Sequence, residues 1–156
     1  MSDPESPVSA TIRPPRLAVL DTQVVLDWLV FRDPSTLPMA AALERGSLRW
    51  LTTRAMQDEF EHVLGRGVAA AWEPDRLAIA QTFDRLSQRV EALASAGPSL
   101  RCSDPDDQMF IDLAFAAGAH WLFTRDRALL RLARSARARG VIVLKPADWD
   151  PREVCD

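Results

Sequence analysis

Four carboxylates in this sequence fall where a parallel α/β fold would bring them to one place. Asp21 and Asp126 come just after short apolar runs that are typical of buried strands. Glu59 lies on the helix expected after the second such run, and Asp107 opens the helix that leads into the third. Ligands of open parallel α/β sheets bind beyond the carboxyl ends of the strands. We therefore predict that these four side chains line one cleft.

Such a cluster of carboxylates favours a bound cation. Negative charges within roughly 4–6 Å of one another raise each other's pKa, so they do not all stay ionised near neutral pH without a cation among them. An all-oxygen donor set suits Mg²⁺ or Mn²⁺ rather than zinc. The histidines, His62 and His120, are expected to be structural, and no Ser-His-Asp hydrolase can be built from them. Spacing alone therefore predicts a metal-binding α/β protein.

Each acid also has a purely structural alternative. Asp21 and Asp126 can cap the helices that follow them, and Glu59 can be one of many solvated helix acids. The acids of the segment 103–107, SDPDD, can act as N-cap or first-turn charges, which the helix dipole favours. The spacing of the acids leaves these alternatives open.

The elements that would position these acids follow from the apolar periodicity. The predicted strands are 17–20, 48–51, 120–123 and 141–144. The predicted helices are 24–31, 37–45, the segment from Thr52 or Thr53 to Leu64, 74–94 as the longest, 103–118 and 127–139. Strands alternating with helices predict an α/β fold with a parallel sheet and helices on both faces.

Length and composition bound the organisation of the chain. Its 156 residues suit a single domain, and the 47% hydrophobic content is ordinary for a globular protein. We expect a flexible, proline-rich arm over residues 1–15, one domain over 16–150 and a tail over 151–156. No signal sequence or long apolar stretch is evident, so a cytoplasmic location without a membrane span is expected.

Charge and cysteine content exclude several classes of protein. The formal net charge is -3, which excludes a global basic field for gripping nucleic acid, so any such contact must be local. Lys145 is the one lysine among 19 basic residues. Two widely separated cysteines, Cys102 and Cys155, form neither a disulfide framework nor a zinc motif, and they fit a reducing compartment.

Four sequence blocks resemble the PIN-domain nucleases. The segment 16–26, RLAVLDTQVVL, is similar to the family's opening, in which a hydrophobic strand runs into Asp-Thr-Asn-Val. The segments 52–64 and 102–119 resemble its second and third blocks. The segment 121–130, WLFTRDRALL, is close to the Leu-Val-Thr-Gly-Asp pattern of a branch related to the VapC-like toxins of toxin–antitoxin systems. The resemblance keeps its order over residues 16–143.

The resemblance implies a fold and a set of site residues. The fold is a three-layer α/β/α arrangement around a central, mostly parallel sheet of four to five strands. The family's catalytic, metal-ligating acids fall on Asp21, Glu59, Asp107 and Asp126. Asp106 is the main rival to Asp107, because the adjacent pair leaves the register open by one residue, and Asp104 is a further candidate ligand.

Five further residues are candidates for supporting the site or binding substrate. They are Thr22, Gln23, Thr124, Arg125 and Arg127. Gln23 stands where the family usually has Asn, which lengthens a side chain expected to support the first acid. Arg125 replaces a frequent glycine and brings a cation beside the cleft, where it can bind a phosphate or pair with the acids.

The activity implied by the resemblance is metal-dependent hydrolysis of RNA phosphodiester bonds by the toxin of a toxin–antitoxin pair. Arginines between 125 and 139 would guide RNA, with Arg127, Arg131 and Arg134 on one helical face, or receive an acidic antitoxin segment. A homodimer is expected through apolar residues of the segments 37–43 or 77–90. The alternative is a catalytically weak PIN-like module that binds RNA or protein. A haloacid-type phosphatase fits less well, because its second Asp would stand at Gln23.

Overall fold

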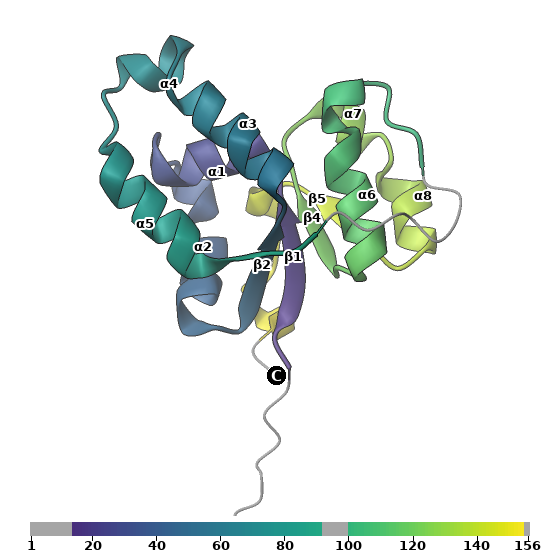
Figure 1. Cartoon of the computed structure of the whole chain (residues 1–156). Coiled ribbons are helices and arrows are strands. Elements are labelled where there is room, and N and C mark those ends of the chain that lie inside the picture. Colours follow the sequence, from purple (N-terminus) through teal and green to yellow (C-terminus); the bar gives the residue numbers. More distant parts are fainter. Residues whose placement is uncertain (1–13, 92–99, 155–156) are drawn as a thin grey trace, which may run out of the picture.

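A five-stranded sheet, with every strand parallel to its neighbours, forms the middle of the molecule (Figure 1). The computed structural model describes residues 14–91 and 100–154. The strands are β1 (Arg16–Leu20), β2 (Leu48–Thr52), β3 (Ser87–Arg89), β4 (Trp121–Phe123) and β5 (Ile142–Leu144), in the order β3-β2-β1-β4-β5. The predicted α/β fold with a parallel sheet is confirmed.

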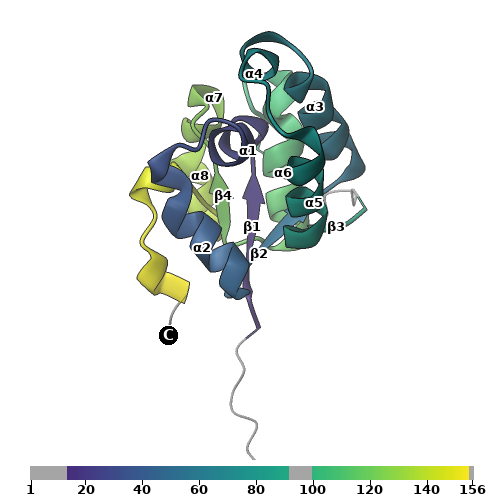
Figure 2. The ribbon, with the colours of Figure 1, turned by 90° about the vertical axis from the view of Figure 1, so that its left-hand side faces the viewer.

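Helices cover both faces of this sheet, which makes three layers (Figures 1 and 2). One layer holds α1 (Thr22–Leu29), α2 (Leu37–Arg45), α3 (Arg54–Leu64), α4 (Gly67–Ala71) and α5 (Arg76–Leu86). The opposite layer holds α6 (Gln108–Ala117), α7 (Arg127–Leu130) and α8 (Ala133–Ala138). Short 3₁₀ turns lie at Pro34–Thr36 (η1), Pro105–Asp107 (η2), Pro146–Asp148 (η3) and Pro151–Val154 (η4).

Alternating strand residues feed two separate hydrophobic cores. Leu20, Trp50 and Phe123 face the layer of α1 to α5, whereas Val19 and Leu122 face the layer of α6 to α8. All five are buried, as the continuous apolar runs predict for a sheet covered on both sides. Burying each such large side chain contributes about 1.5–3 kcal/mol, so the two cores stabilise the strands that carry the site.

Side-chain caps fix where the site-bearing helices begin. Asp21 is the N-cap of α1, and its carboxylate accepts from the Val24 N–H at 2.8 Å. Thr53 caps α3 through the Met56 N–H, and Asp126 caps α7 through the Ala128 N–H. Each cap satisfies a backbone donor that the first helical turn leaves open.

The predicted helix over 74–94 is wrong over residues 87–91, and its last three residues, 92–94, lie outside the described part of the chain. Helix α5 ends at Leu86, and the next three residues form β3, a strand that the apolar pattern did not predict. Ser87 donates its hydroxyl to the Phe83 carbonyl at 2.6 Å and has extended backbone angles. The chain leaves the helix there because residues 87–89 pair with Trp50–Thr52 and complete the edge of the sheet.

The predicted helix over 127–139 is divided into α7 and α8. The Leu132 N–H bonds to the Leu129 carbonyl at 2.9 Å, an i to i−3 bond that tightens the chain between the two helices. Arg127, Arg131 and Arg134 therefore do not share one continuous helical face.

The ends of the chain extend beyond the described residues. Residues 1–13 of the expected arm and residues 155–156 of the expected tail lie outside the described part of the chain. Residues 151–154 form the η4 turn, and Val154 packs against the core of the first layer. Within residues 14–91 and 100–154, no helix has the length and apolar character needed to cross a membrane.

Candidate active site

The candidate site lies where the connections of the sheet diverge. The chain runs from β1 to β2 and β3 on one side, and β4 and β5 lie on the other side. The carboxyl ends of β1 and β4 therefore flank a topological switch point, the usual ligand position in open parallel sheets. The register pairs Leu20 with Phe123, so Asp21 and Thr124 are the next residues on adjacent strands.

Asp21 is buried at this switch point and uses both of its carboxylate oxygens. One oxygen accepts from the Val24 N–H and the other from the Thr124 hydroxyl. Burial raises the pKa of Asp21 to about 6, although both hydrogen bonds act to lower it. Thr124 also accepts from the Asp126 N–H at 2.9 Å, so one buried hydroxyl joins the first acid to the loop that carries the last.

Asp107 and Asp126 lie together with Asp104. One carboxylate oxygen from each lies within 4.8 Å of the others. Burial, followed by the negative charges of Asp126 and Asp104, raises the pKa of Asp107 to about 7. Within the described ranges, Asp107 Oδ2 is buried without a hydrogen-bond partner. This unsatisfied oxygen lies among other carboxylates, so the arrangement fits a bound cation better than an empty acid cluster.

All four acids selected from the sequence line one pocket of about 420 Å³. Its walls are formed by Asp21, Thr22, Gln23, Leu26, Glu59, Val63, Asp107, Arg125 and Asp126. Glu59 comes from α3 in one helical layer and accepts from the Thr22 hydroxyl. Asp107 and Asp126 come from the opposite layer, so the pocket spans the boundary between the two.

The structure distinguishes the rival acids around residue 106. Asp107 lines the pocket, whereas Asp106 is exposed and is not among the residues that line it. The backbone N–H of Asp106 donates to the Asp104 carboxylate at 2.9 Å, so Asp104 caps the η2 turn. Asp104 belongs to the three-acid cluster without lining the pocket itself.

The residues expected to support the site or bind substrate contact different groups. Thr22 and Thr124 bond to acids of the pocket, as described above. Gln23 lines the pocket, and its side chain donates to Asp27 Oδ1 at 2.9 Å. Arg127 is exposed at the start of α7 and does not line the pocket.

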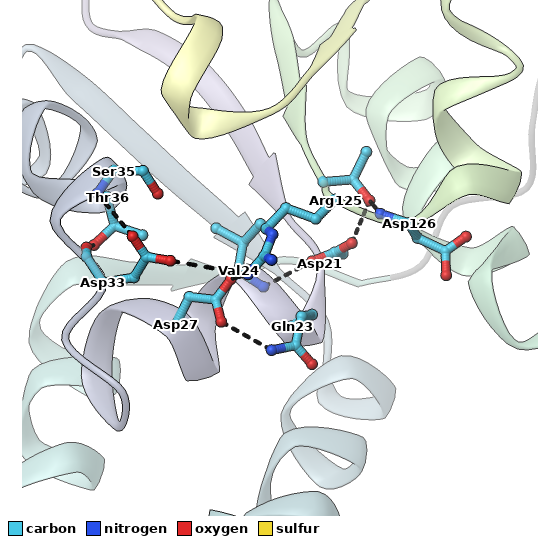
Figure 3. A network of polar contacts seen from close by, with 10 residues as sticks. Asp21, Gln23, Val24, Asp27, Asp33, Ser35, Thr36, Arg125 and Asp126 are labelled. Atoms are coloured by element: carbon cyan, nitrogen blue, oxygen red, sulfur yellow. Dashed lines mark hydrogen bonds and ion pairs between the residues drawn. The ribbon is translucent and has the colours of Figure 1, made fainter.

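Arg125 lines the pocket but pairs with acids that the sequence reasoning missed. Its guanidinium donates to the buried Asp27 carboxylate and lies 3.9 Å from Asp33. Figure 3 shows Arg125 reaching toward these two acids, whereas the Asp126 carboxylate points to the opposite side. The available signal was a lone acid at position 27 within the apolar run VVLDWLVF.

The histidines have no place in this pocket. His120 Nδ1 accepts from the Leu17 N–H at 3.2 Å, and burial lowers its pKa. His62 is exposed on α3. Neither residue lines the acid pocket, so its donor set is made of oxygen atoms, which suits Mg²⁺ or Mn²⁺.

Comparison with known proteins agrees with the sequence blocks and the fold. The PIN domain family matches residues 17–128. A chain from the crystal structure of VapBC2 from Rickettsia felis bound to a DNA fragment from their promoter has a similar fold. The TM-score is 0.55 at 11% identity, and the match covers 81% of this chain and 96% of that one. No curated protein matches the sequence. The family match spans most of the fold and all four pocket acids, and the chain therefore belongs to the PIN-domain family.

Proposed function

We propose that this protein is a metal-dependent endoribonuclease and the toxin of a toxin–antitoxin pair, acting in the cytoplasm. The observation that carries the proposal is the convergence of Asp21, Glu59, Asp107 and Asp126 in one pocket at the switch point of a PIN fold. Asp107 and Asp126 lie within 4.8 Å of each other and of Asp104, and the charge of Asp21 contributes to the raised pKa of Asp107. Such a grouping of carboxylates favours a divalent cation, and hydrolysis of a phosphodiester uses such a cation.

Asp21, Asp107 and Asp126 would hold Mg²⁺ or Mn²⁺, with Glu59 bound directly or through water. The metal would lower the pKa of a bound water and neutralise charge that develops on the phosphoryl group. The chain itself orients the ligands. The Thr124 hydroxyl and the Val24 N–H hold Asp21 in one position.

RNA is proposed as the substrate from the family resemblance, and the local charge supports a nucleic acid. Arg127, Arg131 and Arg134 are exposed on and between α7 and α8, directly after Asp126 in the sequence. Exposed arginines that follow a pocket acid in the sequence can contact phosphates even though the whole chain is acidic.

The test is RNA cleavage by the purified full-length protein with Mn²⁺ or Mg²⁺. We expect cleavage that EDTA abolishes and that falls by at least about 100-fold in Asp21→Asn, because a charge that holds the cation is lost. Asp84→Asn removes an exposed acid of α5 outside the pocket and should leave the rate unchanged. RNA loss that persists in EDTA and in Asp21→Asn would point to contamination and refute the proposal.

An antitoxin partner is proposed from the resemblance to VapC-like toxins and from the structural neighbour, which was crystallised as VapBC2. Co-purification from the native host should recover a small partner protein, and adding this partner should suppress RNA cleavage. An unbound partner, or a bound one that leaves cleavage unchanged, would argue against the toxin assignment while leaving the nuclease assignment intact.

The second candidate is a PIN-like module that binds RNA without cutting it. It is favoured by one observation, that Gln23 turns away from Asp21 to Asp27. This alternative expects RNA binding without cleavage in Mn²⁺ and Mg²⁺, and equal binding by the native chain and Asp21→Asn. Metal-dependent cleavage by the native chain would rule it out.

A further inference from the structure

Arg125 is the single cationic side chain among the residues that line the acid pocket. Four carboxylates line the same walls, so a divalent ion would leave their formal charge at about −2. A phosphodiester carries a further negative charge and would be repelled by that remainder. The half-exposed guanidinium of Arg125 is the group of this wall that can offset the repulsion.

Asp27 holds Arg125 in place. The Asp27 side chain is only 5% exposed, and Arg125 is its cationic partner among residues 14–91 and 100–154. Gln23 Nε2 bonds to Oδ1 of Asp27, while the Arg125 guanidinium bonds to Oδ2. A carboxylate buried this deeply without a cation is costly, so the pair resists separation.

Asp33 provides a second anchor for the same guanidinium nitrogen. Its carboxylate lies 3.9 Å from Arg125 Nη1 and accepts from the Ser35 N–H at 2.9 Å, which fixes it at the start of η1. Arginine has five N–H donors, and here the bonded nitrogen is Nη1. Nε and Nη2 have no partner within the described residues, so they can donate to a ligand.

The anchoring directs the bonded nitrogen of Arg125 to Asp27 and Asp33 rather than to the acids that would hold the metal. Arg125 adjoins Asp126 in the sequence, and a free guanidinium at that position would pair with pocket carboxylates. Such a pair would compete with the cation for the same oxygen atoms. In the structure the side chain is directed to Asp27 and Asp33 instead (Figure 3).

We propose that Arg125 binds a backbone phosphate of the nucleic acid at the mouth of the acid pocket, and that Asp27 is a positioning residue that holds it there and keeps it off the metal-binding acids. The inference rests on the proposed nuclease function. A guanidinium presents two parallel donors that match phosphate oxygens, which lysine cannot reproduce. Phosphate contacts of this kind position a strand without reading its sequence.

The first test measures kinetics of RNA cleavage in Mn²⁺. Arg125→Gln should raise KM on the order of 10- to 100-fold, the range of a hydrogen bond to a charged group, with a smaller change in kcat. Arg125→Lys should recover only part of the loss. Arg45→Gln removes an exposed charge in the last turn of α2, outside the pocket, and should match the native protein.

Binding of RNA separates failure of this inference from failure of the proposed function. The probe is a fluorescein-labelled single-stranded RNA in Mn²⁺, bound to Asp21→Asn with and without Arg125→Gln. Weaker binding on loss of Arg125 supports the phosphate role even if the native chain cuts no RNA. Unchanged binding, or cleavage by Arg125→Gln with the native KM, overturns the inference while leaving a metal-dependent nuclease intact.

The second test examines Asp27 through the affinity for Mn²⁺, measured by paramagnetic resonance of the free ion. Asp27→Asn keeps the shape of the side chain but releases Arg125, so Mn²⁺ affinity should fall several-fold. Adding Arg125→Gln to this variant should restore it, because the competing guanidinium is gone. If the ion pair were purely structural, Arg125→Gln would not restore the Mn²⁺ affinity of Asp27→Asn. A double variant whose Mn²⁺ affinity stays low would therefore overturn the positioning role.

Asp33→Asn provides a second variant in case Asp27→Asn does not fold. Asn can also cap the η1 turn, and Asp33 is about one-third exposed, so the change is tolerated more easily. We expect a smaller loss of Mn²⁺ affinity that Arg125→Gln again reverses. The positioning role would be contradicted if Asp33→Asn bound Mn²⁺ with native affinity and Asp27→Asn either showed no loss of affinity or did not fold.

Discussion

Asp21 and Asp126 each hold a helix end and line the pocket with the same carboxylate. One oxygen of Asp21 accepts from the Val24 N–H at the start of α1, and the other accepts from the Thr124 hydroxyl. Oδ1 of Asp126 accepts from the Ala128 N–H, and Asp126 also belongs to the three-acid cluster. The structural and functional interpretations of these acids are therefore compatible, because the cap fixes how the carboxylate faces the pocket.

The raised pKa of Asp107 leads to a prediction for the metal-free protein. The unfolded carboxyl has a pKa near 3.8, and the folded one near 7. The folded state therefore holds a proton that the unfolded state has lost, and the free energy of unfolding should fall as the pH rises through this window. Asp107→Asn cannot ionise, so its stability advantage over the native chain should grow between about pH 4 and 7 and then level off.

Urea unfolding in EDTA checks this prediction, with the two proteins compared at each pH. The comparison cancels His120, whose lowered pKa acts in the opposite direction. Mn²⁺ at pH 7.5 should stabilise the native chain more than the variant. A stability difference that stays constant from pH 4 to 7, or shrinks, would contradict the assigned environment of Asp107.

The partners of Gln23 and Arg125 could not be predicted from the sequence. The substitution of Arg for a frequent glycine was visible, but the residue that receives the guanidinium lies 98 positions away. Asp21 and Asp107 were easier to select, because strand ends and helix starts are local features. Contacts between side chains of distant elements depend on how those elements pack, and single-sequence patterns do not contain that information.

At the scale of elements, the missed strand β3 illustrates the same limit. Leu77, Phe83 and Val90 continue a helical period that favoured one helix from 74 to 94. The strand Ser-Gln-Arg is short and polar, so no alternation of apolar residues marks it. Its pairing with β2 satisfies backbone groups of that strand, and the short, polar β3 then forms the edge of the sheet.

The truncated α5 still anchors its layer through Phe83. The ring packs against Trp50 with centroids 4.5 Å apart and against Phe60 at 5.3 Å. We expect Phe83→Ala to lower the free energy of unfolding by about 3–5 kcal/mol, because it removes a fully buried ring and leaves a cavity. Urea denaturation measures the loss.

Gln81→Ala is the matched control for Phe83→Ala. Gln81 is exposed on the same helix, so its removal should change the stability by less than about 0.5 kcal/mol. Equal effects of the two substitutions would mean that α5 does not pack on the sheet through Phe83.

At the scale of the whole molecule, the acidic net charge hides an uneven distribution. The acids of the pocket gather at the boundary of the two helical layers, and exposed arginines follow on α7 and α8. The layers also leave large apolar side chains on the surface, among them Leu37, Val68, Trp72 and Leu77, each more than half exposed. Leu37 and Trp72 line one surface pocket, and exposed apolar side chains that form a contiguous patch are typical of interaction sites.

We expect the purified protein to form a homodimer, and sedimentation equilibrium at micromolar concentration measures it. The sequence pointed to the helices that carry Leu37 and Leu77, which are 63% and 71% exposed. Leu37→Glu or Leu77→Glu should give a monomer, according to which of the two residues lies in the interface, because the substitution places a charge in an apolar contact. Gln81→Glu should leave the dimer intact, and a native chain that sediments as a monomer would contradict the expectation.

The order of the strands also governs when the pocket can exist during synthesis. Thr124 and Asp21 are 103 residues apart, and β4 is inserted beside β1 only after both have left the ribosome. A nascent chain that stops short of β4 lacks Asp126 and the hydroxyl that orients Asp21. If the protein is a toxin, translation itself delays the appearance of its activity until most of the chain has been made.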